Sequence, residues 1–297
     1  MKEDDRLTQG RESADSERGI GRKVREADWT QSAVSAEEID PALFPLVEEL
    51  GIIENCRELA QEGWTVLENA VDPAFVSELR SVILETEDSE ALRLGGSVME
   101  LGKHPVYADT LVHPKVFTLA KFSVGQGCLL YTQAISVRGK GSPALDLHCD
   151  QVMFPVPLPE PNMLLTACWV LDEFSEEGGA TCVLPGSGNH RRPPTPEDDL
   201  TGAKPVECPA GSIILWDGRV WHGNCPRTIA GDRVVVHNSY CRLVMRPGID
   251  YSAHADELIQ AHGAPMSQLL GRDDVLFLDY QENDPERLIR TVINATT

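Results

Sequence analysis

Three residues of metal-binding types stand at spacings that could form a single site. His148 and Asp150, in the segment Leu-His-Cys-Asp-Gln, are two positions apart, so an extended backbone would point both side chains the same way. His222, in Val-Trp-His-Gly, lies far downstream, and only a folded sheet could bring it alongside. Two imidazoles and one carboxylate occupy one face of an octahedral ion and leave the opposite face for other reactants, as in non-haem Fe(II) oxygenases. The pattern therefore predicts a mononuclear metal site and an enzyme.

The chain around these residues is predicted to be β-rich from about residue 128 onward. Short apolar runs alternate there with Gly and Pro, a pattern typical of antiparallel strands in a sandwich or barrel. The segment 185–205, with several prolines, is expected to be a loop over one mouth of the barrel. We expect strands at 128–137, 163–171, 181–184, 212–216 and 234–241.

Helix signals dominate the earlier part of the chain. Asp40-Pro41 and Asp72-Pro73 each place a capping side chain before a proline, and Pro114 is likewise expected at the first position of a helix. Gly51 and Gly63 are expected to end helices. We therefore expect a polar and acidic tail whose composition favours disorder, followed by one catalytic domain with flanking helices. The expected ranges are 1–33 for the tail and 34–297 for the domain, divided into a helical part (34–127), a β core (128–245) and a helical or irregular end (246–297).

Charge and cysteine usage narrow the class of protein. The formal net charge of −21 over 297 residues argues against nucleic acid or anionic membrane as a partner, because binding phosphate requires lysine and arginine. No apolar run approaches the length of a membrane span, and residues 1–6 lack the apolar stretch of a signal peptide. The eight cysteines are scattered singly, as expected for reduced thiols. We expect a cytoplasmic enzyme with a small-molecule substrate.

Four segments give the chain a resemblance to a known family. Between about residues 55 and 245, it resembles a phytanoyl-CoA dioxygenase-type Fe(II)/2-oxoglutarate oxygenase. A lone His-x-Asp would be weak support, whereas the ordered set at these intervals is specific. The segments are 62–73 (EGWTVLENAVDP), 147–151 (LHCDQ), 169–187 (WVLDEFSEEGGATCVLPGS) and 209–222 (PAGSIILWDGRVWH).

The resemblance implies a fold, a set of cofactors and site residues. The implied fold is a double-stranded β-helix, that is, a cupin-like jelly roll, with His148, Asp150 and His222 binding Fe(II) and with 2-oxoglutarate and O₂ as cosubstrates. It also implies that Arg233 holds the far carboxylate of 2-oxoglutarate, since a guanidinium can bind a carboxylate through two parallel hydrogen bonds. Arg227, in the turn Cys-Pro-Arg-Thr, is the competing anchor and is interpreted as a solvated surface residue.

Further candidates have two open interpretations each. Trp169 could flank the cosubstrate or be a core aromatic residue, and Gln133 and Arg138 could line the pocket or be ordinary polar residues of a strand. His237 could contact substrate or belong to the core. Cys149 stands where many relatives have glutamine, so any cosubstrate contact made by that glutamine is absent or replaced.

The expected loop carries another candidate group. His190 is interpreted as a loop residue and not a ligand, and Arg191 with Arg192 could be either solubilising surface or the receptor for an anionic substrate group. Asp146 shares the strand parity of His148 and is the rival carboxylate ligand.

These features predict oxygenase chemistry, with two competing classes. We expect a C–H bond of a small metabolite or natural-product intermediate to be hydroxylated, with release of succinate and CO₂. The first alternative is a zinc-dependent hydrolase or isomerase, which would not need Arg233 at its interval. The second is a non-catalytic jelly-roll binding protein with a vestigial site.

Overall fold

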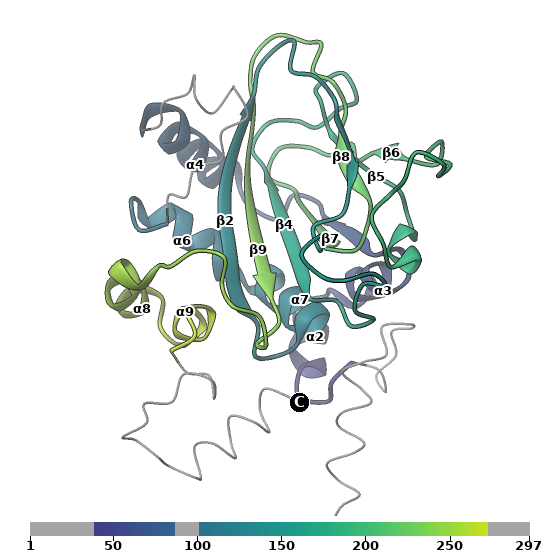
Figure 1. Ribbon diagram of the computed structural model, residues 1–297. Coiled ribbons are helices and arrows are strands. Elements are labelled where there is room, and N and C mark those ends of the chain that lie inside the picture. Colours follow the sequence, from purple (N-terminus) through teal and green to yellow (C-terminus); the bar gives the residue numbers. More distant parts are fainter. Residues whose placement is uncertain (1–38, 87–100, 273–297) are drawn as a thin grey trace, which may run out of the picture.

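Two antiparallel sheets form the centre of the molecule (Figure 1). The computed structural model describes residues 39–86 and 101–272, so the predicted polar tail lies outside the described residues. The larger sheet has the strand order β1-β7-β4-β9-β2, and the smaller sheet has the order β3-β8-β5-β6. The strands are β1 Trp64–Leu67, β2 Leu129–Arg138, β3 Leu145–His148, β4 Leu164–Val170, β5 Thr181–Val183, β6 Lys204–Pro205, β7 Ile213–Asp217, β8 His222–Asn224 and β9 Arg233–Cys241.

Helices pack on one face of the larger sheet. Figure 1 shows α4, α6, α8 and α9 on the side of β2 that faces away from the smaller sheet. The helices are α2 Phe44–Glu49, α3 Ile53–Glu62, α4 Pro73–Thr86, α6 Pro105–Leu111, α7 Pro114–Val124, α8 Ala255–His262 and α9 Ala264–Leu269, with 3₁₀ turns η1 Ser187–His190 and η2 Ser252–His254. None of the helices within residues 39–86 and 101–272 has the length and hydropathy needed to cross a membrane.

Asp72 and Gly63 act as the sequence predicts, whereas the expected helix start at Asp40-Pro41 is wrong, because α2 begins at Phe44 after the N-cap Leu43 and Asp40 caps only the preceding turn. The Asp72 carboxylate accepts a hydrogen bond from the Phe75 N–H (2.9 Å) at the start of α4. Gly63 ends α3 in the left-handed conformation, with φ +78°, where any Cβ would also collide with Val220. The sequence did not predict α6, whose N-cap is His104.

The two faces of the larger sheet bury different side chains. Odd-numbered residues of β4 and β7, such as Trp169 and Ile213, pack into the main core together with the helices. Even-numbered residues of the same strands, such as Cys168, Ile214 and Trp216, pack in a second core with residues of the smaller sheet. The mainly β fold with flanking helices is confirmed, and this alternation decides which residues can reach the site between the sheets.

Candidate metal centre

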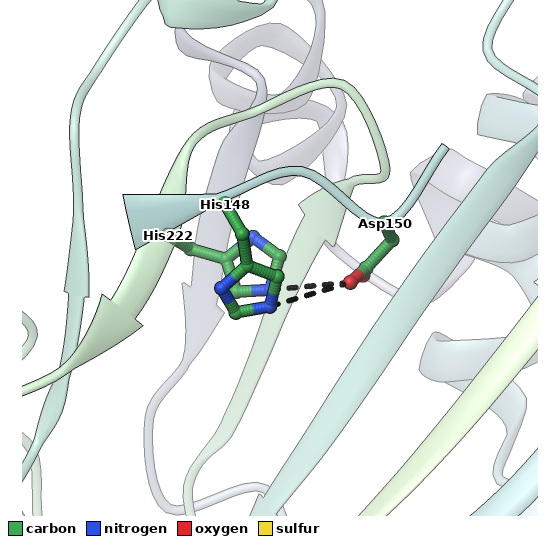
Figure 2. Close-up of side chains that lie close together, drawn as sticks. All are labelled: His148, Asp150 and His222. Atoms are coloured by element: carbon green, nitrogen blue, oxygen red, sulfur yellow. Dashed lines mark ion pairs between the residues drawn. The ribbon is translucent and has the colours of Figure 1, made fainter. Parts of the chain in front are cut away.

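The three predicted ligands lie together between the two sheets. One possible ligand atom from each of His148, Asp150 and His222 lies within 4.8 Å of the others. Asp150 Oδ1 is 3.4 Å from His222 Nε2 and 3.9 Å from His148 Nε2, and both rings point to it (Figure 2). The histidines are register partners at the end of β3 and the start of β8. Asp150 lies in the turn after β3, so the expected continuous extended backbone through both ligands is wrong, although their side chains still converge.

Backbone carbonyl groups orient the two imidazoles. His148 Nδ1 is 3.0 Å from the Asp146 carbonyl oxygen, and His222 Nδ1 is 3.0 Å from the Val220 carbonyl oxygen. A carbonyl can only accept, so each Nδ1 carries a proton, and Nε2 of each ring is the nitrogen that would bind a metal when the ring is neutral. This is the arrangement required of neutral metal-binding histidines. The rival ligand Asp146 contributes its backbone here, and its exposed side chain is not part of the cluster.

Two residues of the larger sheet fix the carboxylate. Asp150 Oδ2 accepts hydrogen bonds from Thr166 Oγ1 (3.1 Å) and Trp216 Nε1 (3.0 Å), which leaves Oδ1 facing the imidazoles. Burial acts to raise the pKa of Asp150, but the charge and hydrogen bond of His222, with the Trp216 bond, outweigh it and hold this pKa well below its ordinary value. Asp150 in turn raises the pKa of His222 against the effect of burial. The carboxylate is therefore ionised and available as an anionic ligand.

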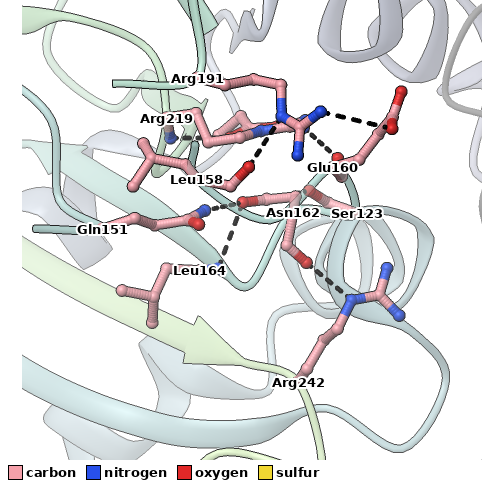
Figure 3. Close-up of polar contacts among 10 residues, drawn as sticks. Ser123, Gln151, Leu158, Glu160, Asn162, Leu164, Arg191, Arg219 and Arg242 are labelled. Atoms are coloured by element: carbon pink, nitrogen blue, oxygen red, sulfur yellow. Dashed lines mark hydrogen bonds and ion pairs between the residues drawn. The ribbon is translucent and has the colours of Figure 1, made fainter. Parts of the chain in front are cut away.

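A buried polar network supports the turn that carries Asp150. Both Asp150 N–H (2.8 Å) and Gln151 N–H (3.1 Å) donate to the Gly218 carbonyl. The Gln151 amide donates to Asn162 Oδ1 (2.6 Å), and Asn162 Nδ2 donates to Ser123 Oγ (2.7 Å), as Figure 3 shows. Gly218 has no room for a side chain, since a Cβ would lie 2.9 Å from the Leu164 Cβ. The ligand turn is thus held by groups that do not themselves face the metal site.

A cavity of about 490 Å³ opens onto the three ligands. Its wall on the larger sheet is built from alternate residues of β2 and β9 and is mostly polar. These wall residues are Thr132, Ala134, Ser136 and Arg138 from β2, and Arg233, His237 and Ser239 from β9. A larger hollow of about 880 Å³ lies along residues 243–252 and contains none of the ligands. The smaller cavity is therefore the candidate active site.

Arg233 lines this cavity and is almost completely buried, with 1% of its surface exposed. Its Nη1 donates to Asn224 Oδ1 (3.0 Å) and to the Gly179 carbonyl, and its guanidinium lies 5.0 Å from the ring centre of Phe174. Its Nε is buried without a hydrogen-bond partner. Burial lowers the pKa of Arg233 to about 10, so the group remains cationic at neutral pH. Such a residue suits an anionic ligand that brings its own acceptor oxygens.

The interpretation of Arg227 as a solvated surface residue is wrong. Arg227 is 5% exposed, and its guanidinium donates to the carbonyls of Gly178 (2.7 Å), Ala230 (2.9 Å) and Gly231 (3.0 Å). It does not line the cavity. Each of its three guanidinium nitrogens thus holds a backbone carbonyl near the turn before β9, outside the cavity.

Trp169 and Gln133 lie on the opposite face of the larger sheet from the ligands. Trp169 packs against Phe75 and His113 in the main core, with ring centres 5.8 and 5.5 Å away. The buried Gln133 amide donates to the Tyr107 carbonyl (2.9 Å) and to Asn238 Oδ1 (3.0 Å). Neither residue lines the cavity, so the cosubstrate-binding interpretation of both is corrected and the core interpretation of Trp169 holds.

The three candidate residues of the expected loop, His190, Arg191 and Arg192, already have partners in the structure. Arg192 forms a two-bonded ion pair with Asp198 (2.6 and 2.7 Å), and Arg191 bonds to the Leu158 carbonyl (2.7 Å) and lies 3.5 Å from Glu160. Figure 3 shows the contacts of Arg191. His190 stacks on Trp221 with ring centres 4.7 Å apart. None of these three predicted substrate residues lines the cavity, and both arginines already have acidic partners.

His237 and Arg138 are the two uncertain candidates that the structure brings to the cavity. Burial, with a smaller effect of Arg233, lowers the pKa of His237 to about 4, so this imidazole is neutral near pH 7. Cys149 lies between two ligands but points away from them, and it is buried against Leu158 and Trp221.

Sequence analysis missed several polar residues of the site. Thr166, Trp216, Ser239 and Asn224 all line the cavity. Thr166 stands three positions before Trp169 on the same predicted strand and therefore faces the other way. Strand parity was the available signal, because Thr166 and Trp216 are both even-numbered residues of paired strands.

The residues present fit Fe(II) and 2-oxoglutarate. Two neutral imidazole nitrogens and one ionised carboxylate converge, which is the donor set that binds iron and leaves positions open. The buried and unpartnered Nε of Arg233 in the same cavity supplies a place for a distant carboxylate.

Comparisons with known proteins agree with this site. The family model for phytanoyl-CoA dioxygenase (PhyH) matches residues 59–234. The dioxygenase af480 of Aspergillus fumigatus is 29% identical over 162 residues, which cover 54% of this chain and 52% of that protein. The dioxygenase trt7 of Aspergillus terreus is 32% identical over 189 residues, covering 56% of this chain and 64% of that protein. The chain thus spans about half the length of af480 and under two thirds of trt7.

Two further matches extend over more of the chain. The uncharacterized protein Rv1501 of Mycobacterium tuberculosis is 25% identical over 227 residues, covering 70% of this chain and 82% of that protein. The crystal structure of HygX from Streptomyces hygroscopicus with nickel and 2-oxoglutarate bound superposes with a TM-score of 0.54 at 19% identity, covering 67% of this chain and 88% of HygX. At that identity the likeness shows the shared fold.

Proposed function

The chain belongs to the phytanoyl-CoA dioxygenase family, and we propose that it is a non-haem Fe(II)/2-oxoglutarate-dependent dioxygenase that hydroxylates a C–H bond of a small molecule. The observation that carries this proposal is the convergence of the Nε2 atoms of His148 and His222 with Asp150 Oδ1, at the wall of a cavity that also contains a buried arginine. The proposed products besides the hydroxylated substrate are succinate and CO₂.

Each residue of the site has a defined part in this proposal. His148, Asp150 and His222 would hold the iron, and Arg233 would bind the far carboxylate of 2-oxoglutarate. When bound, iron and 2-oxoglutarate supply the activation of O₂ that oxidises the substrate. Thr166 and Trp216 keep Asp150 Oδ2 occupied, so the carboxylate presents one oxygen to the metal. Arg233 fixes the orientation of the cosubstrate because its own position is fixed by Asn224 and Gly179.

Trp216 and His237 are the aromatic side chains of the cavity wall beside the ligands. The Trp216 ring lies 4.7 Å from the His222 ring and 6.0 Å from the His237 ring. Because His237 is neutral near pH 7, it adds no charge beside the ligands.

Anaerobic binding of Fe(II) and 2-oxoglutarate tests the proposed activity. We expect the wild-type protein to develop a visible charge-transfer band and, in air, to form succinate from 2-oxoglutarate. Asp150→Ala should abolish both, whereas Asp146→Ala, which removes an exposed carboxylate outside the cluster, should keep them. Absence of the band in the wild type, together with metal-dependent hydrolysis supported by Zn²⁺, would favour the hydrolase class instead.

We further propose that the substrate is a small metabolite or natural-product intermediate. The cavity volume of about 490 Å³ lies within the usual range for small-molecule sites. Candidate compounds can be screened by the rise in succinate formation that a true substrate produces. A compound that raises succinate formation without itself being oxidised would not qualify as the substrate.

A further inference from the structure

Two arginines face each other at one end of the cavity. Arg138, the last residue of β2, pairs directly with Arg233, the first residue of β9. Directly opposed residues of an antiparallel pair project from the same face of the sheet, and both arginines line the cavity. Like charges opposed in this way destabilise a sheet unless a counter-charge is supplied.

No carboxylate of the described residues forms an ion pair with either arginine. By contrast, Arg80, Arg192 and Arg219 pair with Asp172 (2.9 Å), Asp198 (2.6 Å) and Asp217 (2.5 Å). Asp172 raises the pKa of Arg233 at a distance, but its oxygens accept from Arg80 Nε and the Val234 N–H. Within residues 39–86 and 101–272, Arg138 and Arg233 therefore place two positive charges in one cavity with no carboxylate paired to either, in a chain whose net charge is −21.

Both guanidinium groups also have an unused donor. The Nε atoms of Arg138 and Arg233 are buried and have no hydrogen-bond partner. Buried donors are normally satisfied, and an unsatisfied charged donor costs more than a neutral one. An anion in this end of the cavity would supply acceptors to both groups and relieve their repulsion.

The two arginines differ in depth, which separates their roles. Arg233 is almost completely buried, whereas Arg138 is partly exposed at the end of its strand and donates to the Pro143 carbonyl in the following loop. The deeper group suits the cosubstrate that binds within the site. The outer group is partly exposed and is therefore open to a second molecule from solvent.

We propose that Arg138 binds an anionic group of the primary substrate, a carboxylate or a phosphate, while Arg233 holds 2-oxoglutarate. This inference rests on the proposed function and names the class of its substrate. It also assigns to Arg138 the role that Arg191 and Arg192 cannot fill, because those two arginines are neutralised by Asp198 and Glu160.

The test uses simple anions as probes on the anaerobic Fe(II)–2-oxoglutarate complex, in which Arg233 is occupied. Benzoate and inorganic phosphate are titrated, with uncharged benzamide as the matched control for benzoate. Binding is followed by the change in the charge-transfer band and by the thermal unfolding midpoint. The proteins are the wild type, Arg138→Gln, Arg138→Lys, Arg233→Gln and Arg246→Gln, the last removing a positive charge from an exposed residue outside this cavity.

We expect saturable binding of at least one anion to the wild type and to Arg246→Gln, and no comparable binding of benzamide. Arg138→Gln should weaken anion binding by about tenfold or more, as for a lost charge-assisted hydrogen bond, and Arg138→Lys should lose less. The concentration of 2-oxoglutarate that gives half of the maximal band should change by less than about twofold in Arg138→Gln. A change of this size is expected when the substituted residue does not contact 2-oxoglutarate.

Three results would overturn the assignment. One is that neither anion binds to a wild-type complex that shows the band. Another is that Arg138→Gln and Arg138→Lys bind the anions as tightly as the wild type does. The third is that Arg138→Gln weakens 2-oxoglutarate as much as Arg233→Gln, which would place Arg138 in the cosubstrate site. Absence of the band in the wild type would instead refute the proposed function.

Discussion

The two faces of the larger sheet are made by the same strands but have different tasks. On β4 and β9, Trp169 and Val236 face the helices and fill the main core, while Thr166 and His237 face the smaller sheet and line the cavity. The helix-side face is mostly large and apolar, and the cavity-side face carries small polar and cationic groups. The difference shows that adjacent residues of one strand can serve stability and chemistry separately.

Asp150→Ala should produce the largest effect on the cavity side. It removes the anionic metal ligand, so 2-oxoglutarate turnover should fall by more than about 100-fold. Substitution of residues that only support metal ligands typically lowers activity by about 10- to 100-fold. The variant should keep its fold, because the change removes no apolar group from the main core and breaks only the side-chain hydrogen bonds from Thr166 and Trp216. Succinate formation and circular dichroism measure the two outcomes. A variant with full turnover and wild-type circular dichroism would show that Asp150 is not a ligand.

Trp169→Ala should have the converse effect on the helix side. Loss of this buried indole should lower the free energy of unfolding by about 3–5 kcal/mol, as for other large-to-small core changes. Below its unfolding temperature, the variant should form the Fe(II)–2-oxoglutarate band at wild-type cosubstrate concentrations. Urea denaturation and band titration test the two statements. A selective loss of 2-oxoglutarate binding in folded Trp169→Ala would show that Trp169 takes part in cosubstrate binding.

His237 should make stability depend on pH. Its pKa is about 4 in the folded protein against an ordinary value of 6.5. Between these values the unfolded chain binds a proton that the folded chain does not, so stability is full above pH 6.5 and falls as the pH drops towards 4. The loss should be on the order of 2–3 kcal/mol in the metal-free protein.

The measurement is urea denaturation from pH 4.5 to 7.5, with His237→Gln as the comparison. The difference between the two proteins isolates His237 from His222 and Asp150, which also titrate. Parallel stability curves for wild type and His237→Gln would show that His237 is protonated alike in both states.

Arg233→Lys should produce the smallest of these effects. The charge is kept but the two-bonded geometry is lost, so 2-oxoglutarate binding should weaken by about 1–3 kcal/mol. Arg227→Lys is the comparison variant, because Arg227 is the competing anchor and its guanidinium donates to three backbone carbonyls outside the cavity. The band titration compares both variants. A larger loss of cosubstrate affinity in Arg227→Lys than in Arg233→Lys would reassign the anchor.

Sequence reasoning succeeded where local spacing determines structure. The pair His148 and Asp150 needed only two positions of separation to be identified as neighbours. Asp72 and Gly63 mark helix ends because capping depends on residues within one turn. These features were therefore predictable before any tertiary contact was known, whereas the double-stranded β-helix and the role of Arg233 were expected only from the family resemblance.

The roles of Trp169, Gln133 and Arg227 were less accessible for physical reasons. Every residue of β4 is buried, so hydrophobicity gives no alternation from which to assign the face of Trp169. The buried amide of Gln133 is satisfied by α6, a helix that the sequence did not reveal. The buried guanidinium of Arg227 donates to the carbonyls of Gly178, Ala230 and Gly231. These carbonyls meet around it only in the folded chain, so the sequence near Arg227 gives no sign of its burial.

The three carbonyl contacts of Arg227 have a consequence for the selection of cosubstrate length. They brace the segment that joins β8, where His222 lies, to β9, where Arg233 begins. The separation between the ligand and the anchor is then set by the backbone and does not adjust to the molecule that binds. A diacid one methylene shorter or longer than 2-oxoglutarate would have to bend or strain to reach both ends. Discrimination among 2-oxo diacids would thus depend on a residue that contacts none of them.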